Sequence, residues 1–253
     1  MKLLTKEWYM TMQNSGLGVM LRADDRAAVF SEELYRQVRE EKLNNWLADQ
    51  RELQEYLEEP YDEAAACQSF AELYDRQLEE FRTRTPEKIL EKVADVRMLA
   101  LGLCTEEVYR DFKQYRALCE KWTEKTMEEA LNMRISQGLE KAFTGEHSLH
   151  DSFVLSMKRE GEDLVIEFEY DEDATWPEIK AIRFRDAEIL KQEQPMENAW
   201  WLYDEIWRTE EETIEIHALL WKENEVFELT VECRDTEILW TVPPVGTPCA
   251  HLY

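Results

Sequence analysis

The spacing of the apolar residues changes at Phe143-Thr144-Gly145, and this change constrains the fold more than any other feature of the chain. Before it, apolar residues recur every three or four positions, as on one face of a helix. After it they recur every second position, as on one face of a strand. We therefore expect an α+β protein with a helical domain over residues 1–145 and an antiparallel β domain over residues 146–253.

The first domain is expected to be an up-and-down bundle of four or five amphipathic helices. After an opening segment that contains Trp8, we expect long helices that begin near Phe30, Asp62, Pro86 and Thr105. Pro60 stops the first, Gly102 ends the third, and the fourth extends with a break to about Leu139. We assign the aromatic and methionine stripes of these helices to the core rather than to a ligand pocket, because core is the commoner case.

The second domain begins with a β-hairpin signature, in which two alternating segments flank the turn residues Glu160-Gly161-Glu162-Asp163. Phe153, Leu155 and Met157 are expected on one face of its first strand. About seven strands with short connections predict an antiparallel sheet, either a sandwich or a single curled sheet. The alternation does not distinguish between these two arrangements.

The charge of the chain is strongly negative and unevenly distributed. The net charge is −26, and residues 146–253 hold 9 Lys or Arg against 27 Asp or Glu, a balance of −18. Such a field repels phosphate backbones and anionic lipid, so neither nucleic acid nor a membrane surface is an expected partner. Either the acidic surface only keeps the protein soluble, or it docks an unidentified basic protein.

The motifs for metal, phosphate and secretion are missing from the sequence. The five cysteines form no C-x-x-C pair, and Gly16-Leu17-Gly18 lacks the rest of a phosphate-binding loop, so we expect no metal and no cofactor. Lys6 and Glu7 interrupt the only apolar run at the start of the chain, and no later stretch is long enough to span a membrane. We expect free thiols and a cytoplasmic location.

His147-Ser148-Leu149-His150-Asp151-Ser152 is the densest cluster of chemically capable side chains, and His147, His150 and Asp151 are the candidate catalytic residues. If the strand begins at Leu149, His147 and Asp151 share one side of it and His150 lies on the other, so the two histidines do not chelate one ion. The competing interpretation is structural, with Asp151 and Ser152 bonded to the backbone where the strand begins.

A second cluster, Trp200-Trp201-Leu202-Tyr203-Asp204-Glu205, combines large aromatic rings with carboxylates. We take Trp200, Trp201, Tyr203, Asp204 and Glu205 as candidate binding residues, although one tryptophan is expected to fill the core. Neighbouring residues of a strand point to opposite faces, so Asp204 and Glu205 are not expected to act as the acid and nucleophile of a glycosidase.

Three segments together resemble a known family. Leu4-Thr5-Lys6-Glu7-Trp8-Tyr9, Leu149-His150-Asp151-Ser152 and the Trp200–Glu205 segment are similar to an uncharacterised family of Bacillus and related Firmicutes, a domain of unknown function. The resemblance implies a bacterial cytoplasmic protein and assigns no catalytic residue. The acidic strand domain is also similar in composition and class to immunity proteins of bacterial toxin systems.

These observations lead to two hypotheses about function. The first is a non-enzymatic protein-binding module with an acidic docking face, such as an immunity-type inhibitor. The second is a hydrolase at the junction of the domains, in which His147, His150 and Asp151 act with Asp204 or Glu205. Convergence of these side chains in one pocket favours the hydrolase, and their distribution over separate faces favours binding.

Overall fold

The computed structural model describes residues 2–57, 60–144, 147–171 and 177–241. Gly145 of the expected domain boundary therefore lies outside the described residues, as do Glu172, Asp173 and Cys249. Within the described ranges helices precede an antiparallel sheet, which confirms the α+β fold class. By their internal contacts the residues form two compact units, Thr11–Trp122, and Met1–Met10 together with Thr123–Tyr253.

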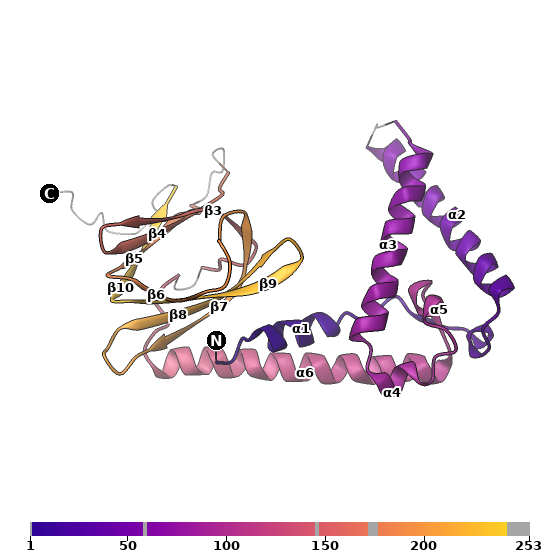
Figure 1. Cartoon of the computed structure of the whole chain (residues 1–253), viewed down its shortest axis with the longest axis horizontal. Coiled ribbons are helices and arrows are strands. Elements are labelled where there is room, and N and C mark those ends of the chain that lie inside the picture. Colours follow the sequence, from indigo (N-terminus) through magenta and orange to yellow (C-terminus); the bar gives the residue numbers. More distant parts are fainter. Residues whose placement is uncertain (1, 58–59, 145–146, 172–176, 242–253) are drawn as a thin grey trace. The chain divides into compact units, whose positions relative to one another are not determined.

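The helices begin where the sequence supplies a side chain that can cap their free backbone N–H groups. Ser31 accepts a hydrogen bond from the Leu34 N–H at 3.2 Å, and Asp62 accepts one from the Ala65 N–H at 3.1 Å. The α-helices are α1 (Lys6–Asn14), α2 (Glu32–Tyr56), α3 (Glu63–Arg84), α4 (Glu87–Leu90), α5 (Val96–Ala100) and α6 (Glu106–Ser136) (Figure 1).

The observed helices differ from the expected ones at three places. The single helix expected from Pro86 to Gly102 is wrong, because Asp95 is extended and caps a new short helix by accepting the Arg97 N–H at 2.8 Å. The opening segment forms α1, whose nine residues bury only Trp8 and so give no periodic signal. The break expected in the last helix is absent, since α6 runs unbroken through the described residues Glu106–Ser136.

The helical unit Thr11–Trp122 has a core of its own. Residues of α2, α3, α5 and α6 contribute to one buried cluster, in which Leu103 and Phe112 are fully buried. Gly102 ends α5 with a positive φ of 79°, a conformation that glycine adopts without steric cost. This turn leads to a short parallel pairing of β1 (Arg22–Ala23) with β2 (Leu103–Cys104).

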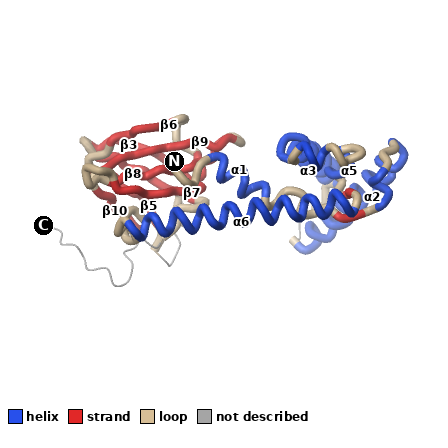
Figure 2. The backbone as a smooth tube through the Cα atoms, turned by 90° about the horizontal axis from the view of Figure 1, so that it is seen from below, coloured by secondary structure: helices blue, strands red, loops and turns tan. Residues whose placement is uncertain are grey.

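The second unit is built on one sheet of eight strands in the order β10-β5-β4-β3-β7-β8-β9-β6. Figure 2 shows the strands of this sheet in red. The strands are β3 (Ser152–Glu160), β4 (Asp163–Phe168), β5 (Ile179–Arg185), β6 (Glu188–Gln192), β7 (Ala199–Arg208), β8 (Ile214–Lys222), β9 (Glu225–Cys233) and β10 (Asp235–Trp240). All its pairings are antiparallel. Of the two expected arrangements, the structure has the single curled sheet.

Two very short connections explain the curl. Only Asp186 and Ala187 join β5, near one edge of the sheet, to β6 at the other edge, and only Arg234 joins β9 to β10. Connections this short require opposite ends of the sheet to approach each other, as Figure 1 shows. The concave face encloses one apolar cluster to which strands from β3 to β9 contribute.

A β-bulge changes which residues of β3 face this core. Val154 pairs with Phe168 but Ser156 pairs with Glu167, so Leu155 is the extra residue of the bulge. Val154 is fully buried, Leu155 is 47% exposed, and Met157 packs against the core cluster. The expectation that Phe153, Leu155 and Met157 share one face is wrong, because the extra residue of the bulge turns Met157 toward the core whereas Leu155 stays on the other face.

The chain between α6 and β3 also packs into this core. Arg134 donates hydrogen bonds to the carbonyl oxygens of Leu139 and Ala142, at 3.0 and 2.8 Å. Leu139 and Phe143 are buried in the apolar cluster of the sheet, although both precede the boundary expected at residue 145. That boundary stays a prediction, which limited proteolysis around residues 143–148 would test.

Candidate functional site

A tight turn before β3 positions the first cluster of candidate residues. Asp151 has a positive φ of 63° and donates its backbone N–H to the Trp201 carbonyl at 2.9 Å, and the Ser148 hydroxyl accepts the His150 N–H at 3.0 Å. The strand begins at Ser152 rather than at Leu149, so strand alternation does not govern this segment. The turn directs His147 and Asp151 to one pocket and His150 elsewhere.

This pocket, which we call the Trp200 pocket, has a volume of about 370 Å³ and is lined by aromatic and acidic side chains. Its lining includes Phe153 and Trp200 on neighbouring strands, Trp240 at the end of β10, and Glu169 and Glu178. His147 and Asp151 complete this part of the lining. Two candidate catalytic residues and one candidate binding residue thus meet here.

Edge-to-face contacts hold the aromatic side chains of the pocket. The rings of Phe153 and Trp200 lie 5.0 Å apart at 62°, and those of His147 and Trp240 lie 4.5 Å apart at 72°. Trp200 nevertheless keeps 38% of its surface exposed. An indole held in this way presents a largely pre-formed surface to a ligand.

The charge of the pocket is negative. Three carboxylates, of Asp151, Glu169 and Glu178, belong to its lining, and the described lining residues include no lysine or arginine. The Asp151 side chain is 73% exposed and lies 3.6 Å from the His150 imidazole. Glu178 accepts the Asp171 N–H at 2.8 Å, which fixes its carboxylate at the pocket. Aromatic faces beside carboxylates suit a cationic group.

The remaining candidates lie outside the Trp200 pocket. The His150 Nδ1 atom lies 2.5 Å from the Leu202 carbonyl oxygen, and its ring packs 4.7 Å from that of Tyr203. Tyr203 in turn makes an edge-to-face contact with Trp8, with ring centroids 4.9 Å apart. Both His150 and Tyr203 are therefore engaged with other parts of the sheet unit.

Trp201 and Asp204 lie toward the core of the sheet. Trp201 is fully buried and donates its indole N–H to the Asp204 carboxylate at 3.0 Å. A bulge between Trp201 and Tyr203 places Asp204 opposite Ala218, which is a core residue. Burial raises the pKa of the Asp204 carboxyl above its usual range, although the indole N–H and the charge of Arg134 act in the opposite direction.

Glu205 lies on the opposite face of β7. It is 5% exposed, and its carboxylate accepts the backbone N–H groups of Lys2, Leu3 and Leu4. The Leu3 and Leu4 bonds are 3.0 and 3.2 Å long. Asp204 and Glu205 thus do not converge with His147 and Asp151.

The structure adds residues that the sequence patterns did not indicate. Phe153, Glu169, Glu178 and Trp240 line the Trp200 pocket, and the pairing of the strands brings them there from separate segments. His217 is a further buried polar residue, and its Nε2 atom contacts the Glu215 carboxylate. Burial is the main reason why the pKa of His217 is lowered.

We expect Asp204→Asn to stabilise the protein at pH 7 but not below about pH 4. The folded-state pKa of Asp204 is raised, so the protonated side chain contributes stability that is fully present below the ordinary value of about 3.9 and is lost as the pH rises through the folded-state pKa. Asparagine stays neutral and can still accept the Trp201 N–H. Urea unfolding at pH 7 and pH 3.5 measures the difference.

The control for this prediction is Glu210→Gln in the exposed turn between β7 and β8, which should change the free energy of unfolding by less than about 0.5 kcal/mol at either pH. An Asp204→Asn effect of the same size at both pH values would contradict the assigned cause.

Several other site classes receive no support from the described residues. Within these ranges no group of three or more His, Cys, Asp or Glu side chains could hold a metal ion. Among the described cysteines, Cys67, Cys104, Cys119 and Cys233 form no disulfide, and the last three are buried. Among the helices described, none combines the length and the apolar character needed to cross a membrane.

Comparison with known proteins identifies one relationship. A family model described as a protein of unknown function (DUF4085) matches residues 29–231, most of the chain. No curated protein and no solved structure matches this chain.

Proposed function

The chain belongs to the DUF4085 family of proteins of unknown function, and from the geometry of its sheet we propose that it is a protein-binding module that docks a basic segment of a partner in the Trp200 pocket. In this proposal a lysine or arginine side chain of the partner lies against the Trp200 indole. The positive charge of that partner side chain is paired with the carboxylates at the rim of the pocket.

One observation carries the proposal: an exposed tryptophan and three carboxylates share one pocket whose described lining has no cation. A cation over an indole gains about 0.5–2 kcal/mol, and more when water is excluded. The carboxylates of Asp151 and Glu169 add Coulomb attraction at the rim. The same groups disfavour an anionic ligand.

The charge of the surrounding chain supports a basic partner. Residues 146–253 carry a balance of −18, which attracts a basic protein over long range and raises its association rate. This is the electrostatic character expected of an immunity-type inhibitor of a basic toxin, and we include that role as the specific form of the proposal.

The separation of the remaining candidates favours binding over hydrolysis. Asp204 is bonded to Trp201, and Glu205 holds the backbone of residues 2–4 on the other face of the sheet. No carboxylate from these positions lines the Trp200 pocket, where the hydrolase hypothesis needs one beside His147 and Asp151.

Fluorescence anisotropy with a labelled Lys-Gly repeat peptide tests the proposal. The wild-type chain should bind this peptide, and should bind the same peptide with glutamine in place of lysine far more weakly. Trp200→Ala should weaken binding of the lysine peptide about tenfold, because the cation–π contact of roughly 1.4 kcal/mol is lost. Glu169→Gln should weaken it less, and added salt should reduce the effect of Glu169.

Tyr56→Ala is the matched control, because it removes an exposed aromatic side chain, 83% accessible, from α2. It should bind the lysine peptide as the wild type does. If Trp200→Ala also binds like the wild type, the acidic surface attracts the peptide without using the pocket, and the proposal is wrong.

A further inference from the structure

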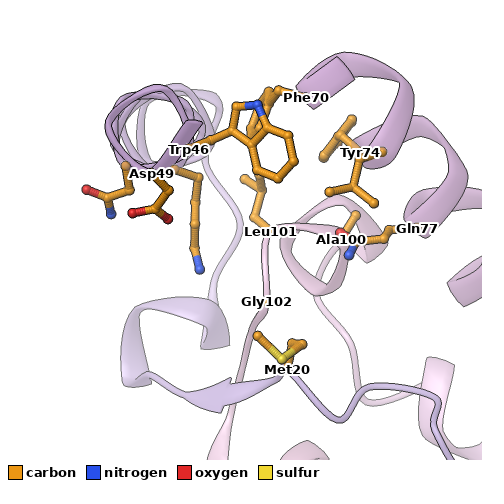
Figure 3. A pocket seen from close by; sticks show the side chains of 12 residues that line it. Met20, Trp46, Asp49, Phe70, Tyr74, Gln77, Ala100, Leu101 and Gly102 are labelled. Atoms are coloured by element: carbon orange, nitrogen blue, oxygen red, sulfur yellow. The ribbon is translucent and has the colours of Figure 1, made fainter. Parts of the chain in front are cut away.

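A second pocket lies within the helical unit, between α2, α3 and the residues that follow α5 (Figure 3). Its volume is about 320 Å³, which is in the range of small-molecule sites. We call it the Lys42 pocket. It is independent of the Trp200 pocket and of the function proposed above.

The walls of the Lys42 pocket are largely apolar. Trp46 lies on α2, Phe70 and Tyr74 lie on α3, and Leu101 lies below them (Figure 3). The rings of Trp46 and Phe70 are 6.5 Å apart, and the Trp46 indole N–H donates to the Ala66 carbonyl at 2.9 Å. Because that bond fixes the indole, the pocket has a pre-formed aromatic wall.

The aromatic stripe on these helices therefore does more than fill the core. Phe70 and Tyr74 are 9% and 7% exposed, as core residues are, yet both also line this pocket. The Tyr74 hydroxyl is bonded to that of Tyr35 at 3.1 Å, so its polar end is already satisfied. These rings therefore present apolar surface to a ligand.

Lys42 places a positive charge in the lining of this pocket. Its side chain is half-buried in the lining, and within the described residues it makes no hydrogen bond and no salt bridge. Gly102 lies against it, since a Cβ atom at that position would be 3.6 Å from the Lys42 Nζ atom. An ammonium group that is partly withdrawn from water and has no carboxylate partner favours pairing with an anion.

The charges near Lys42 are of both signs. Burial lowers the pKa of Lys42, and the positive charge of Arg22 lowers it further, whereas Glu41 opposes both. Arg22 therefore adds to the positive potential at Lys42, although it does not line the pocket. Asp49, which Figure 3 shows beside Trp46, also belongs to the lining and lies on α2, as Lys42 does, so its carboxylate opposes an anion.

We propose that the Lys42 pocket binds a small organic anion with a flat apolar ring, whose acidic group pairs with Lys42 and whose ring packs against Trp46 and Phe70. Charge complementarity selects the acid, and the fixed aromatic wall selects the ring. A neutral molecule of the same shape can use only the second contact.

Titration of the full chain with 2-naphthoate and with neutral 2-naphthamide tests this proposal. The protein carries ¹³C-labelled methionine methyl groups, because Met20 lines the pocket and Met157 of the sheet serves as the internal reference. We expect naphthoate to shift the Met20 signal and to leave the Met157 signal unchanged. Naphthoate should also bind about tenfold more tightly than naphthamide, because its charge-assisted hydrogen bond to Lys42 contributes at least the roughly 1.4 kcal/mol that a tenfold difference in affinity requires.

Lys42→Met retains the aliphatic stem and should remove this preference while naphthamide binding remains. Lys113→Met, at an exposed lysine of the same unit, is the matched control and should retain the preference. Equal affinity for the two probes, a preference that survives Lys42→Met, or no shift of Met20 with either probe would each overturn the proposal.

Discussion

Replacing Trp201 by alanine should destabilise the protein by about 3–5 kcal/mol, the usual cost of removing a large buried aromatic side chain. Trp201 is fully buried, and its ring lies 6.0 Å from that of Phe143 and 5.9 Å from that of Phe168. The substitution also leaves the Asp204 carboxylate without its indole donor. Urea unfolding followed by circular dichroism measures the change.

The neighbouring Trp200→Ala is the control for this prediction. Trp200 is 38% exposed, so its loss should cost about 1 kcal/mol or less. If the two substitutions destabilise the protein equally, the assignment of Trp201 to the core and of Trp200 to the surface is wrong.

The second large effect is expected from Glu205→Ala, at about 3 kcal/mol. Hydrogen bonds to a charged group contribute roughly 1.5–3 kcal/mol each and are not additive, and Glu205 accepts three backbone N–H groups from residues 2–4. Without the carboxylate these donors lose their partner beside Leu4, which is 2% exposed. Besides the loss of stability, we expect faster hydrogen exchange at the Leu3 and Leu4 amides.

Glu210→Ala, in an exposed turn of the same sheet, should change stability by less than about 0.5 kcal/mol and leave exchange at Leu3 and Leu4 unchanged. Unaltered exchange in Glu205→Ala would show that the carboxylate does not hold the N-terminal segment.

The fold class follows from periodicity, because each half of the chain buries one face and that burial imposes its own spacing. The hairpin turn at Glu160-Gly161-Glu162-Asp163 was predictable for the same reason, together with the positive φ of 68° that Gly161 adopts. Local chemistry also predicted the N-terminus of α3, where Asp62 accepts the Ala65 N–H.

The differences between the predicted and the observed structure have local causes that the pattern of apolar residues does not reveal. The bulge at Leu155 reverses the alternation in β3 without any glycine or proline to mark it. Asp95 caps a new helix in the middle of a continuous apolar pattern, because its carboxylate competes for a backbone N–H. The curl of the sheet depends on strand order, which alternation leaves undetermined.

The site was predictable only in part. The sequence pointed to His147, Asp151 and Trp200, which line one pocket, but it equally pointed to His150, Trp201, Tyr203, Asp204 and Glu205, which do not. Phe153, Glu169 and Trp240 reach the pocket through long-range strand pairing. Lys42 gave no signal, since an isolated lysine on a helix is ordinary until its surroundings are known.

The most direct test of the binding proposal is the NMR signal of the lysine that enters the Trp200 pocket. A lysine peptide carrying ¹³C-labelled dimethyl groups on its amines is titrated with the protein, because methyl groups over an indole face shift upfield while the cationic charge is retained. We predict an upfield shift on binding to the wild-type chain and to Tyr56→Ala, and its loss in Trp200→Ala. Bound peptide whose methyl signals do not shift, or shift equally in Trp200→Ala, would contradict docking in this pocket.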